Sequence, residues 1–234
     1  MRSTLTIALL VGVLIATQTA PAVAAPTGSE TSSTSQAPPN QPPPVTCFGK
    51  KPTKTGTAGD DVIKGTPGDD VIVGLGGKDT ISGMGGYDLI CGGSGDDFVY
   101  GEDATLKGVF GNKLDGGAGD DHVVGDTGTD TITGGTGDDW LYGHQGADTL
   151  QGGYDADVLV GAAGNDYHDG QSGDDIIEAT VADDVGDVNF VNGGSGSDEI
   201  YTKQGNSDSG DGGTGWDGCK KDSGDAVSSC EYSL

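Results

Sequence analysis

A nine-residue repeat limits the possible folds of this chain more than any other feature of its sequence. Residues 116–178 read as seven consecutive units in one register: GGAGDDHVV, GDTGTDTIT, GGTGDDWLY, GHQGADTLQ, GGYDADVLV, GAAGNDYHD and GQSGDDIIE. Gly stands first in each unit, Asp stands sixth, and an aliphatic residue usually stands eighth. A fixed period of nine is not the pattern of an ordinary globular domain, and it predicts a stacked repeat structure.

The same register extends to both sides of this stretch. Five regular units occupy residues 56–100. Two degenerate units, at residues 107–115 and 184–192, each follow a short loop and carry Asn112 and Asn189 at the sixth position. Both interruptions therefore preserve the array.

Two regular units complete the array near its carboxyl end. They occupy residues 193–201 and 212–220, and the residues between them, 202–211, look irregular. We expect residues 47–220 to form the repeat domain together with a cap before its first unit. Residues 221–234 are expected to form a carboxy-terminal cap or tail.

Asp occupies the sixth position of all fourteen regular units. If Asp stood there only because it favours turns, Asn, Ser or Gly would share the position. The preceding glycines allow tight turns that expose carbonyl oxygens, and calcium is a hard cation that takes six to eight oxygen ligands. The candidate metal ligands are Asp61, Asp70, Asp79, Asp88, Asp97, Asp121, Asp130, Asp139, Asp148, Asp157, Asp166, Asp175, Asp198 and Asp217.

The eighth position is predicted to point into the core, because the last three residues of a unit form a short strand with alternating side chains. Twelve of the fourteen eighth residues are aliphatic, which predicts a thin but continuous core. The eighth residues are Ile63, Ile72, Ile81, Ile90, Val99, Val123, Ile132, Leu141, Leu150, Leu159, His168, Ile177, Ile200 and Cys219. We expect His168 to be a buried neutral histidine with a satisfied hydrogen bond rather than a metal ligand.

These units resemble the RTX, or haemolysin-type, calcium-binding nonapeptide, and the resemblance covers most of residues 56–220. It implies an all-β fold, a right-handed parallel β-roll with two repeats per coil. It also implies several calcium ions, each held between a turn and the equivalent turn one coil later. One row of ligands would run through Asp61, Asp79, Asp97, Asp121, Asp139, Asp157, Asp175 and Asp198. The opposite row would join Asp70 to Asp88, and Asp130 to Asp148 and Asp166.

Three residues depart from the family pattern. Asn112 and Asn189 lack the charge of Asp, so calcium sites beside them should be weak or empty. Asp155 replaces the fourth-position Gly of its unit, which puts the geometry of that turn in doubt.

The charge of the chain also indicates a bound cation. There are 37 acidic residues against 11 basic ones, and the formal net charge is −26. High net charge with low hydrophobicity favours disorder unless something offsets the repulsion, which multivalent cations would do. The same charge disfavours nucleic acid and anionic membrane surfaces as partners. We therefore expect the chain to fold when it binds calcium and to be largely unfolded without it.

The first residues predict export. Residues 1–24 contain Arg2, an apolar run and the segment Ala-Val-Ala, which is the layout of a secretory signal peptide. The apolar run is shorter than the roughly 20 residues that a membrane span needs. Residues 25–46 are rich in Ser, Thr and Pro and should form a linker. Together with the resemblance, these features predict a secreted, extracellular bacterial protein that uses the general export route.

Four cysteines fit an extracellular chain. Cys47, Cys91, Cys219 and Cys230 permit three pairings in two disulfides. The pairing of Cys47 with Cys91 and of Cys219 with Cys230 is favoured because each bridge would staple one end of the array. No CxxC spacing supports a zinc site instead.

The sequence favours a non-catalytic role. The repeats begin only ten residues after the linker ends, which leaves no room for a catalytic domain, and the chain lacks GxSxG, HExxH and P-loop motifs. A calcium-dependent structural, adhesive or matrix protein is the favoured function. The alternatives are an ice-binding β-roll, which would need a regular ladder of Thr or Asn, and an enzyme with unrecognised chemistry on the loops at residues 101–106 and 179–183.

Two repeats per coil would divide the outward residues between two faces. The predicted apolar face holds Phe98, Tyr100, His122, Val124, Trp140, Tyr142, Val158, Val160 and Ile176. The opposite face should be mostly polar, with Thr131, Thr133, Thr149, Gln151 and Asp169. Contiguous aromatic side chains commonly mark a contact surface. This face is a candidate for contact with a partner, a second copy or cell-wall glycan, unless strand propensity alone accounts for it.

Overall fold

The computed structural model describes residues 45–101, 111–179, 187–202, 207–221 and 223–234. The predicted signal peptide lies outside the described residues, and so does the predicted linker apart from its last two residues. Both predicted loops also lie outside them, apart from the first residue of each.

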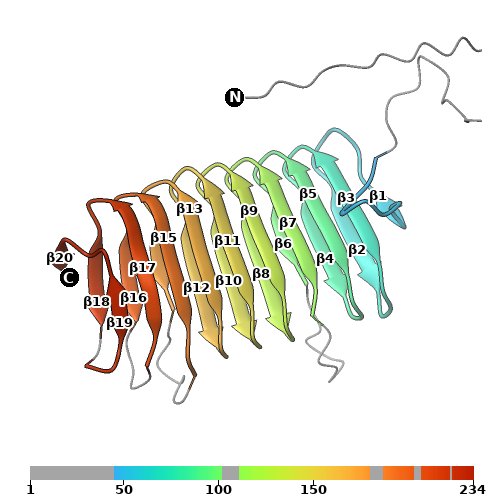
Figure 1. Cartoon of the computed structure of the whole chain (residues 1–234). Coiled ribbons are helices and arrows are strands. Elements are labelled where there is room, and N and C mark those ends of the chain that lie inside the picture. Colours follow the sequence, from blue (N-terminus) through green and yellow to red (C-terminus); the bar gives the residue numbers. More distant parts are fainter. Residues whose placement is uncertain (1–44, 102–110, 180–186, 203–206, 222) are drawn as a thin grey trace, which may run out of the picture. The chain divides into compact units, whose positions relative to one another are not determined.

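Two parallel ten-stranded sheets make up the described part of the chain (Figure 1). One sheet holds β1 (Lys54–Thr55), β3 (Val71–Gly76), β5 (Leu89–Ser94), β7 (Lys113–Ala118), β9 (Thr131–Thr136), β11 (Thr149–Tyr154), β13 (Tyr167–Ser172), β15 (Phe190–Gly196), β17 (Ser209–Gly215) and β19 (Ala226–Ser228). The other holds β2 (Val62–Thr66), β4 (Thr80–Met84), β6 (Phe98–Tyr100), β8 (His122–Thr127), β10 (Trp140–Gln145), β12 (Val158–Ala163), β14 (Ile176–Glu178), β16 (Glu199–Thr202), β18 (Gly218–Lys221) and β20 (Tyr232–Ser233).

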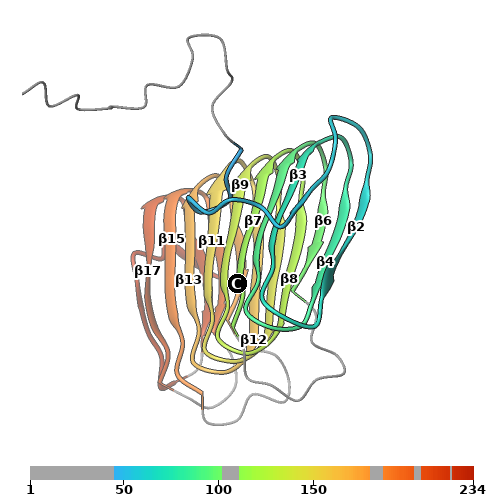
Figure 2. The ribbon, with the colours of Figure 1, turned by 90° about the vertical axis from the view of Figure 1, so that its right-hand side faces the viewer.

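Successive strands alternate between the two sheets, which face each other in Figure 2. Leu150 of β11 lies in register with Ile132 of β9 and with His168 of β13. In the regular coils these partners are 18 residues apart, which is two nonapeptides. The prediction of an all-β, parallel β-roll with two repeats per coil is confirmed. Most strands are longer than the three residues expected, because they continue into the first three residues of the next unit.

One continuous column of apolar side chains fills the space between the sheets. Its buried members are Ile72, Ile81, Ile90, Val99, Leu114, Val123, Ile132, Leu141, Leu150, Leu159, Ile177, Ala179, Val191, Ile200, Cys219 and Val227. Ile63, at the amino end, is only partly buried. Leu114 and Val191 belong to the degenerate units, so the register predicted for those units is confirmed.

The sharp turns of the coils require positive φ at the second position of many units. Glycine adopts such angles without strain, and Gly135 has a φ of 129°. Non-glycine residues adopt them elsewhere, with φ of 100° at Asp126 and 87° at His144, and each costs about 1–3 kcal/mol. Asp155 has a φ of 75°, so it takes up a conformation that usually needs Gly. The doubt about that turn is thereby resolved, since the turn is kept at the expense of backbone strain.

The interpretation of residues 202–211 as irregular is wrong for its second half. β17 begins at Ser209 and pairs with β15 in register, from Phe190 beside Ser209 onward. The segment is hard to recognise because Gly210 stands at the inward eighth position, where other units have a larger side chain. After residue 220 the strands β19 and β20 add to both sheets.

Disulfides lie near both ends of the roll. Cys47 is bonded to Cys91, and Cys219 is bonded to Cys230, which is the pairing favoured from the sequence. The first bridge holds a short hairpin, in which Cys47 pairs with Lys50, against the outer surface of the odd-numbered sheet.

Candidate metal centre

The sixth-position aspartates lie in two rows, one along each edge of the roll. The first row follows the turns that lead from an odd-numbered strand into the next even-numbered strand. In it each backbone N–H donates to Oδ1 of the carboxylate one coil later, as from Asp121 to Asp139 at 2.8 Å and from Asp139 to Asp157 at 2.9 Å. The row consists of Asp61, Asp79, Asp97, Asp121, Asp139, Asp157, Asp175, Asp198 and Asp217.

The second row follows the opposite edge and contains two amides. It consists of Asp70, Asp88, Asn112, Asp130, Asp148, Asp166, Asn189, Asp208 and Asp225. Asn112 and Asn189 keep the hydrogen-bond pattern, since their Oδ1 atoms accept from the N–H groups of Asp88 and Asp166. The geometry of this row is thus continuous while its charge is not.

Three acidic members of the rows escaped the sequence interpretation. Asp208 accepts from the N–H of Asn189 at 2.8 Å, and Asp225 accepts from Asp208 at 3.3 Å. Glu231 accepts from the N–H of Asp217 at 2.7 Å and so continues the first row. Counting the register backward from Gly212 would have placed Asp208 at the sixth position.

Twelve of the aspartates have one buried oxygen, Oδ2, that makes no hydrogen bond within the described structure. They are Asp79, Asp88, Asp97, Asp121, Asp130, Asp139, Asp148, Asp157, Asp166, Asp175, Asp198 and Asp217. A buried carboxylate oxygen without a partner is costly, and buried charges are normally paired or bound to metals. These two rows of oxygens therefore fit a series of bound cations.

The first two aspartates of the array differ from these twelve. Asp61 Oδ2 accepts from the backbone N–H of Thr57 at 2.6 Å and from its hydroxyl at 2.9 Å. Asp70 Oδ2 accepts from the same groups of Thr66 at 2.6 and 2.8 Å. These carboxylates are satisfied inside their own turns, so they have less need of a cation.

Burial raises the pKa of most carboxyls in the two rows. It raises the pKa of Asp121, Asp148 and Asp157 to about 8, and the charges of neighbouring aspartates add to the effect while backbone N–H donors oppose it. At Asp70 burial acts in the same direction, but hydrogen bonds from Thr66 and Thr53 outweigh it and the pKa is lowered. At neutral pH the interior of the rows therefore disfavours ionised carboxylates unless a cation accompanies them.

The first position of each regular unit is Gly because oxygens occupy the space beside it. A Cβ on Gly134 would lie 2.3 Å from Asp139 Oδ2 and 2.7 Å from the carbonyl oxygen of Gly152. A carboxylate oxygen and a carbonyl oxygen from the next coil thus lie against the same point. Calcium accepts both kinds of oxygen as ligands.

No three His, Cys, Asp or Glu side chains converge on a single point in the described ranges. A structural zinc site would need such a group, since it is built from three or four His and Cys side chains. The available ligands here are carboxylates one coil apart together with backbone carbonyls. This set suits calcium better than zinc along the rows.

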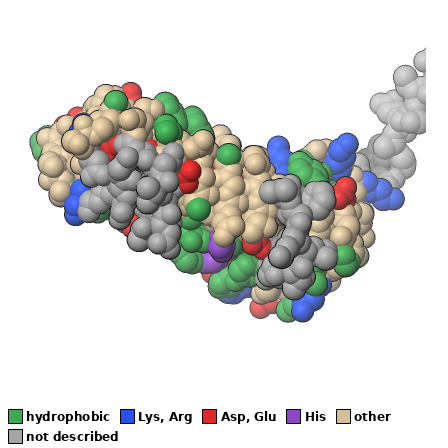
Figure 3. Space-filling view, turned by 90° about the horizontal axis from the view of Figure 1, so that it is seen from below, with side chains coloured by type: hydrophobic (Ala, Val, Ile, Leu, Met, Phe, Trp, Pro, Cys, Tyr) green, Lys and Arg blue, Asp and Glu red, His purple; other side chains and the backbone are tan. Residues whose placement is uncertain are grey.

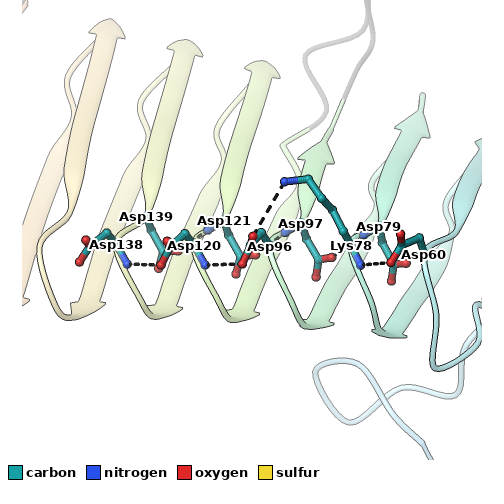
Figure 4. A network of polar contacts seen from close by, with 9 residues as sticks. All are labelled: Asp60, Lys78, Asp79, Asp96, Asp97, Asp120, Asp121, Asp138 and Asp139. Carbon is teal, nitrogen blue, oxygen red and sulfur yellow. Dashed lines mark hydrogen bonds and ion pairs between the residues drawn. The ribbon is translucent and has the colours of Figure 1, made fainter.

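A second line of acids flanks the first row on the solvent side (Figure 4). These fifth-position carboxylates are exposed, and each accepts the N–H of the fifth residue one coil later, as Asp120 does from Asp138 at 3.0 Å. Lys78 takes this position in one coil, and its Nζ lies 3.9 Å from Asp96. The first row is therefore the more acidic edge of the roll.

His168 lies inside the roll at the eighth position, as predicted, but the hydrogen bond expected for it is missing. The side chain is fully buried, and among the described residues neither ring nitrogen meets a hydrogen-bond partner in good geometry. Burial lowers the pKa of His168 to about 4, and the backbone of Phe190 opposes this only in part. The imidazole is accordingly neutral at physiological pH.

The fold and the rows define a calcium-binding parallel β-roll. A family model described as the RTX calcium-binding nonapeptide repeat (four copies) matches residues 55–90, 75–104, 115–150, 133–168, 142–177 and 186–208. These matches cover more than half of the chain, so the chain belongs to the RTX calcium-binding nonapeptide repeat family. No curated protein matches the sequence.

Proposed function

We propose that the sixth-position aspartates hold calcium ions along both rows and that this binding folds the protein. The proposal rests above all on the twelve buried Oδ2 atoms that make no hydrogen bond in the described structure. The proposed ligands are the fourteen predicted aspartates together with Asp208, Asp225 and Glu231. The sites next to Asn112 and Asn189 bind calcium more weakly, because an amide carries no charge.

Adjacent residues of one turn offer a matched test of the ligand assignment. Asp139 is buried with a free Oδ2, whereas Asp138 beside it is exposed and holds only the backbone N–H of Ala156. Asp139→Asn should lower the number of calcium ions bound in calorimetric titration and weaken the remaining binding. Asp138→Asn, which keeps the accepting oxygen, should leave both unchanged. Equal titration curves for the two variants would remove the assignment.

The protein is proposed to act outside the cell as a non-catalytic structural, adhesive or matrix component. Disulfides persist in oxidising compartments, and this chain has two and no free cysteine. No helix in the described ranges has the length and hydrophobicity to cross a membrane. Export through the amino-terminal signal would deliver the chain to an environment where calcium is abundant enough to fill weak sites.

The even-numbered sheet carries a surface suited to contact. Trp140 lies in register between His122 and Val158, and Tyr142 lies between Val124 and Val160. The ring centroids of His122 and Trp140 are 4.1 Å apart, and Trp140 is 43% exposed. Figure 3 shows hydrophobic side chains gathered beside a histidine near the middle of the molecule. This apolar face, with Phe98 and Tyr100, is the proposed surface for self-association or for cell-wall glycan.

The opposite face differs in part from the expectation. Thr131 and Thr149 lie side by side as predicted, but Tyr167 and Phe190 continue the same line and stack at 5.2 Å. Because the line changes from Thr to aromatic residues, it forms no regular ladder of the kind that ice binding requires. We therefore do not propose that function.

Substitution of two aromatic residues tests the contact surface. Trp140→Ser combined with Tyr142→Ser should abolish self-association in sedimentation velocity, or attachment to purified cell-wall glycan, in saturating calcium. Trp216→Ser is the control, since Trp216 is 64% exposed and lies near the carboxyl end of the roll. If the double variant associates and attaches as the unchanged protein does, the apolar face has no such role.

A further inference from the structure

A line of exposed carboxylates runs along one edge of the apolar face (Figure 4). Asp96, Asp120 and Asp138 are exposed, and each stands two residues before an outward-facing ring of the even-numbered sheet. Each carboxylate accepts one backbone N–H through Oδ1, at 3.4, 3.0 and 3.0 Å. Asp120 and Asp138 have no ionic partner among the described residues. Aromatic rings and uncompensated negative charge therefore lie side by side on this surface.

One coil shows how a positive group fits between the carboxylates and the rings. Lys78 holds the fifth position of the coil before Asp96, and its Nζ lies 3.9 Å from Asp96 Oδ2 and 5.0 Å from the centre of the Phe98 ring. A carboxylate and the face of an aromatic ring both attract an ammonium group. Two coils later Asp120 stands in the place of Lys78 and Trp140 in the place of Phe98. That place has two carboxylates and a larger ring, and no ammonium among the described residues.

The rings are spaced for a ligand that lies along the roll. Phe98 and Tyr100 are on β6, and Trp140 and Tyr142 are on β10, with β8 between the two strands. The two aromatic pairs are therefore separated by two strand spacings, or about 10 Å. Alternate sugars of an extended β-1,4-linked polysaccharide face the same way and are separated by a similar length. An extended peptide presents alternate side chains about 7 Å apart, which matches neither one strand spacing nor two.

We propose that the apolar face binds a β-1,4-linked glucosamine polymer that lies along the roll axis. This inference rests on the proposed contact surface and names its ligand. The sugar rings pack on Tyr100, Trp140 and Tyr142, and the ammonium groups of the polymer lie beside Asp120 and Asp138. The charge of the polymer is what the surface selects, because an uncharged glycan contacts the rings alone and an anionic glycan is repelled.

The test compares two oligomers of the same length and linkage, one of glucosamine and one of N-acetylglucosamine. Each is titrated by calorimetry into the full chain in saturating calcium, at a slightly acidic pH at which the sugar amines are charged. Circular dichroism checks that the roll stays folded. Asp138→Asn removes a charge beside Trp140 and keeps the oxygen that accepts the N–H of Ala156. The matched control is Asp174→Asn, which removes a charge from the same line beside Ile176.

The unchanged protein and the control should bind the glucosamine oligomer at least about tenfold more tightly than the acetylated one, as expected of several exposed ion pairs. Asp138→Asn should weaken glucosamine binding by about 2–5-fold and leave the binding of the acetylated oligomer and of calcium unchanged.

Three results would overturn the inference, and they differ in what else they remove. Equal binding of the two oligomers leaves the contact surface in place but removes its selection of charge. Binding of neither oligomer removes the glycan as a ligand of this surface. A Lys-containing peptide of similar length that binds when the glucosamine oligomer does not assigns the surface to a basic protein instead.

Discussion

Acidification should stabilise the calcium-free roll, because its buried carboxyls have pKa values above that of an exposed Asp. For Asp148 burial raises the pKa from 3.8 to about 8. A group with a raised folded-state pKa contributes stability below its unfolded pKa and loses it as the pH rises through the folded value. A pKa that is roughly four units higher in the folded state than in the unfolded state changes the free energy of unfolding by about 6 kcal/mol at most. The contribution of one such carboxyl is therefore comparable to the whole free energy of unfolding of a typical protein, which is about 5–15 kcal/mol.

Far-UV circular dichroism of the chelator-treated chain from about pH 8 to about pH 5 measures this linkage. This range stays above the sequence pI of about 4.1, where the chain would lose its net charge. The β-sheet signal should grow as the pH falls through the values near 8, 7 and 6 at which Asp148, Asp175 and Asp198 take up protons. The calcium-loaded chain should instead lose β-sheet signal as the pH falls, because protons displace the bound cations. A calcium-free chain that is equally or less structured in acid would refute the reasoning.

Three further predictions follow from the packing and the rows. Gly134→Ala should destabilise the calcium-loaded roll by about 1–3 kcal/mol through overpacking, which a lower thermal midpoint would show. Gly68→Ala is the control and should leave the midpoint unchanged, because a Cβ there meets nothing within 4 Å. Asn112→Asp should restore a charge to the second row and raise the amount of calcium bound at equilibrium dialysis; unchanged binding would count against that row as a set of sites. Replacing Cys47 and Cys91 by Ser removes a disulfide between residues 44 apart, and it should lower the free energy of unfolding in denaturant by about 4 kcal/mol. A much smaller decrease would show that the disulfide contributes little to stability.

The fold was predictable because the repeat carries its own register. The side chains of Ile132, Leu141 and Leu150 recur every nine residues, which predicts stacked repeats, while the two units per coil came from the resemblance to the RTX nonapeptide. The degenerate units were recognised for the same reason, since Asn112 and Leu114 kept the sixth and eighth positions. Asp208 was missed where this cue fails, because Gly210 offers no apolar side chain to count from.

Local features that depend on neighbours in space could not be read from the sequence. Thr57 stands in a unit much like the others, yet its hydroxyl and N–H satisfy Asp61 and leave that carboxylate unlike the rest of its row. Asp155 could be recognised from the sequence as a departure from Gly, but only the structure shows that the turn keeps its positive φ. His168 was expected to find a hydrogen bond, and only the arrangement of the adjacent coils shows that it has none in good geometry.

The stacking of Tyr167 on Phe190 shows a related limit. Phe190 belongs to a degenerate unit, so its place beside Tyr167 depends on how the chain resumes its register after residues outside the described ranges. The sequence indicated a mostly polar surface there. The structure instead adds an aromatic pair to it.

The most direct test of the account is the far-UV spectrum of the full chain at neutral pH, first with EGTA and then with calcium in millimolar excess. The account predicts a largely unfolded chain in EGTA and a β-rich spectrum that appears as calcium is added, because at neutral pH the ionised carboxylates of the two rows are not stable when buried without cations. Identical β-rich spectra under both conditions would contradict it.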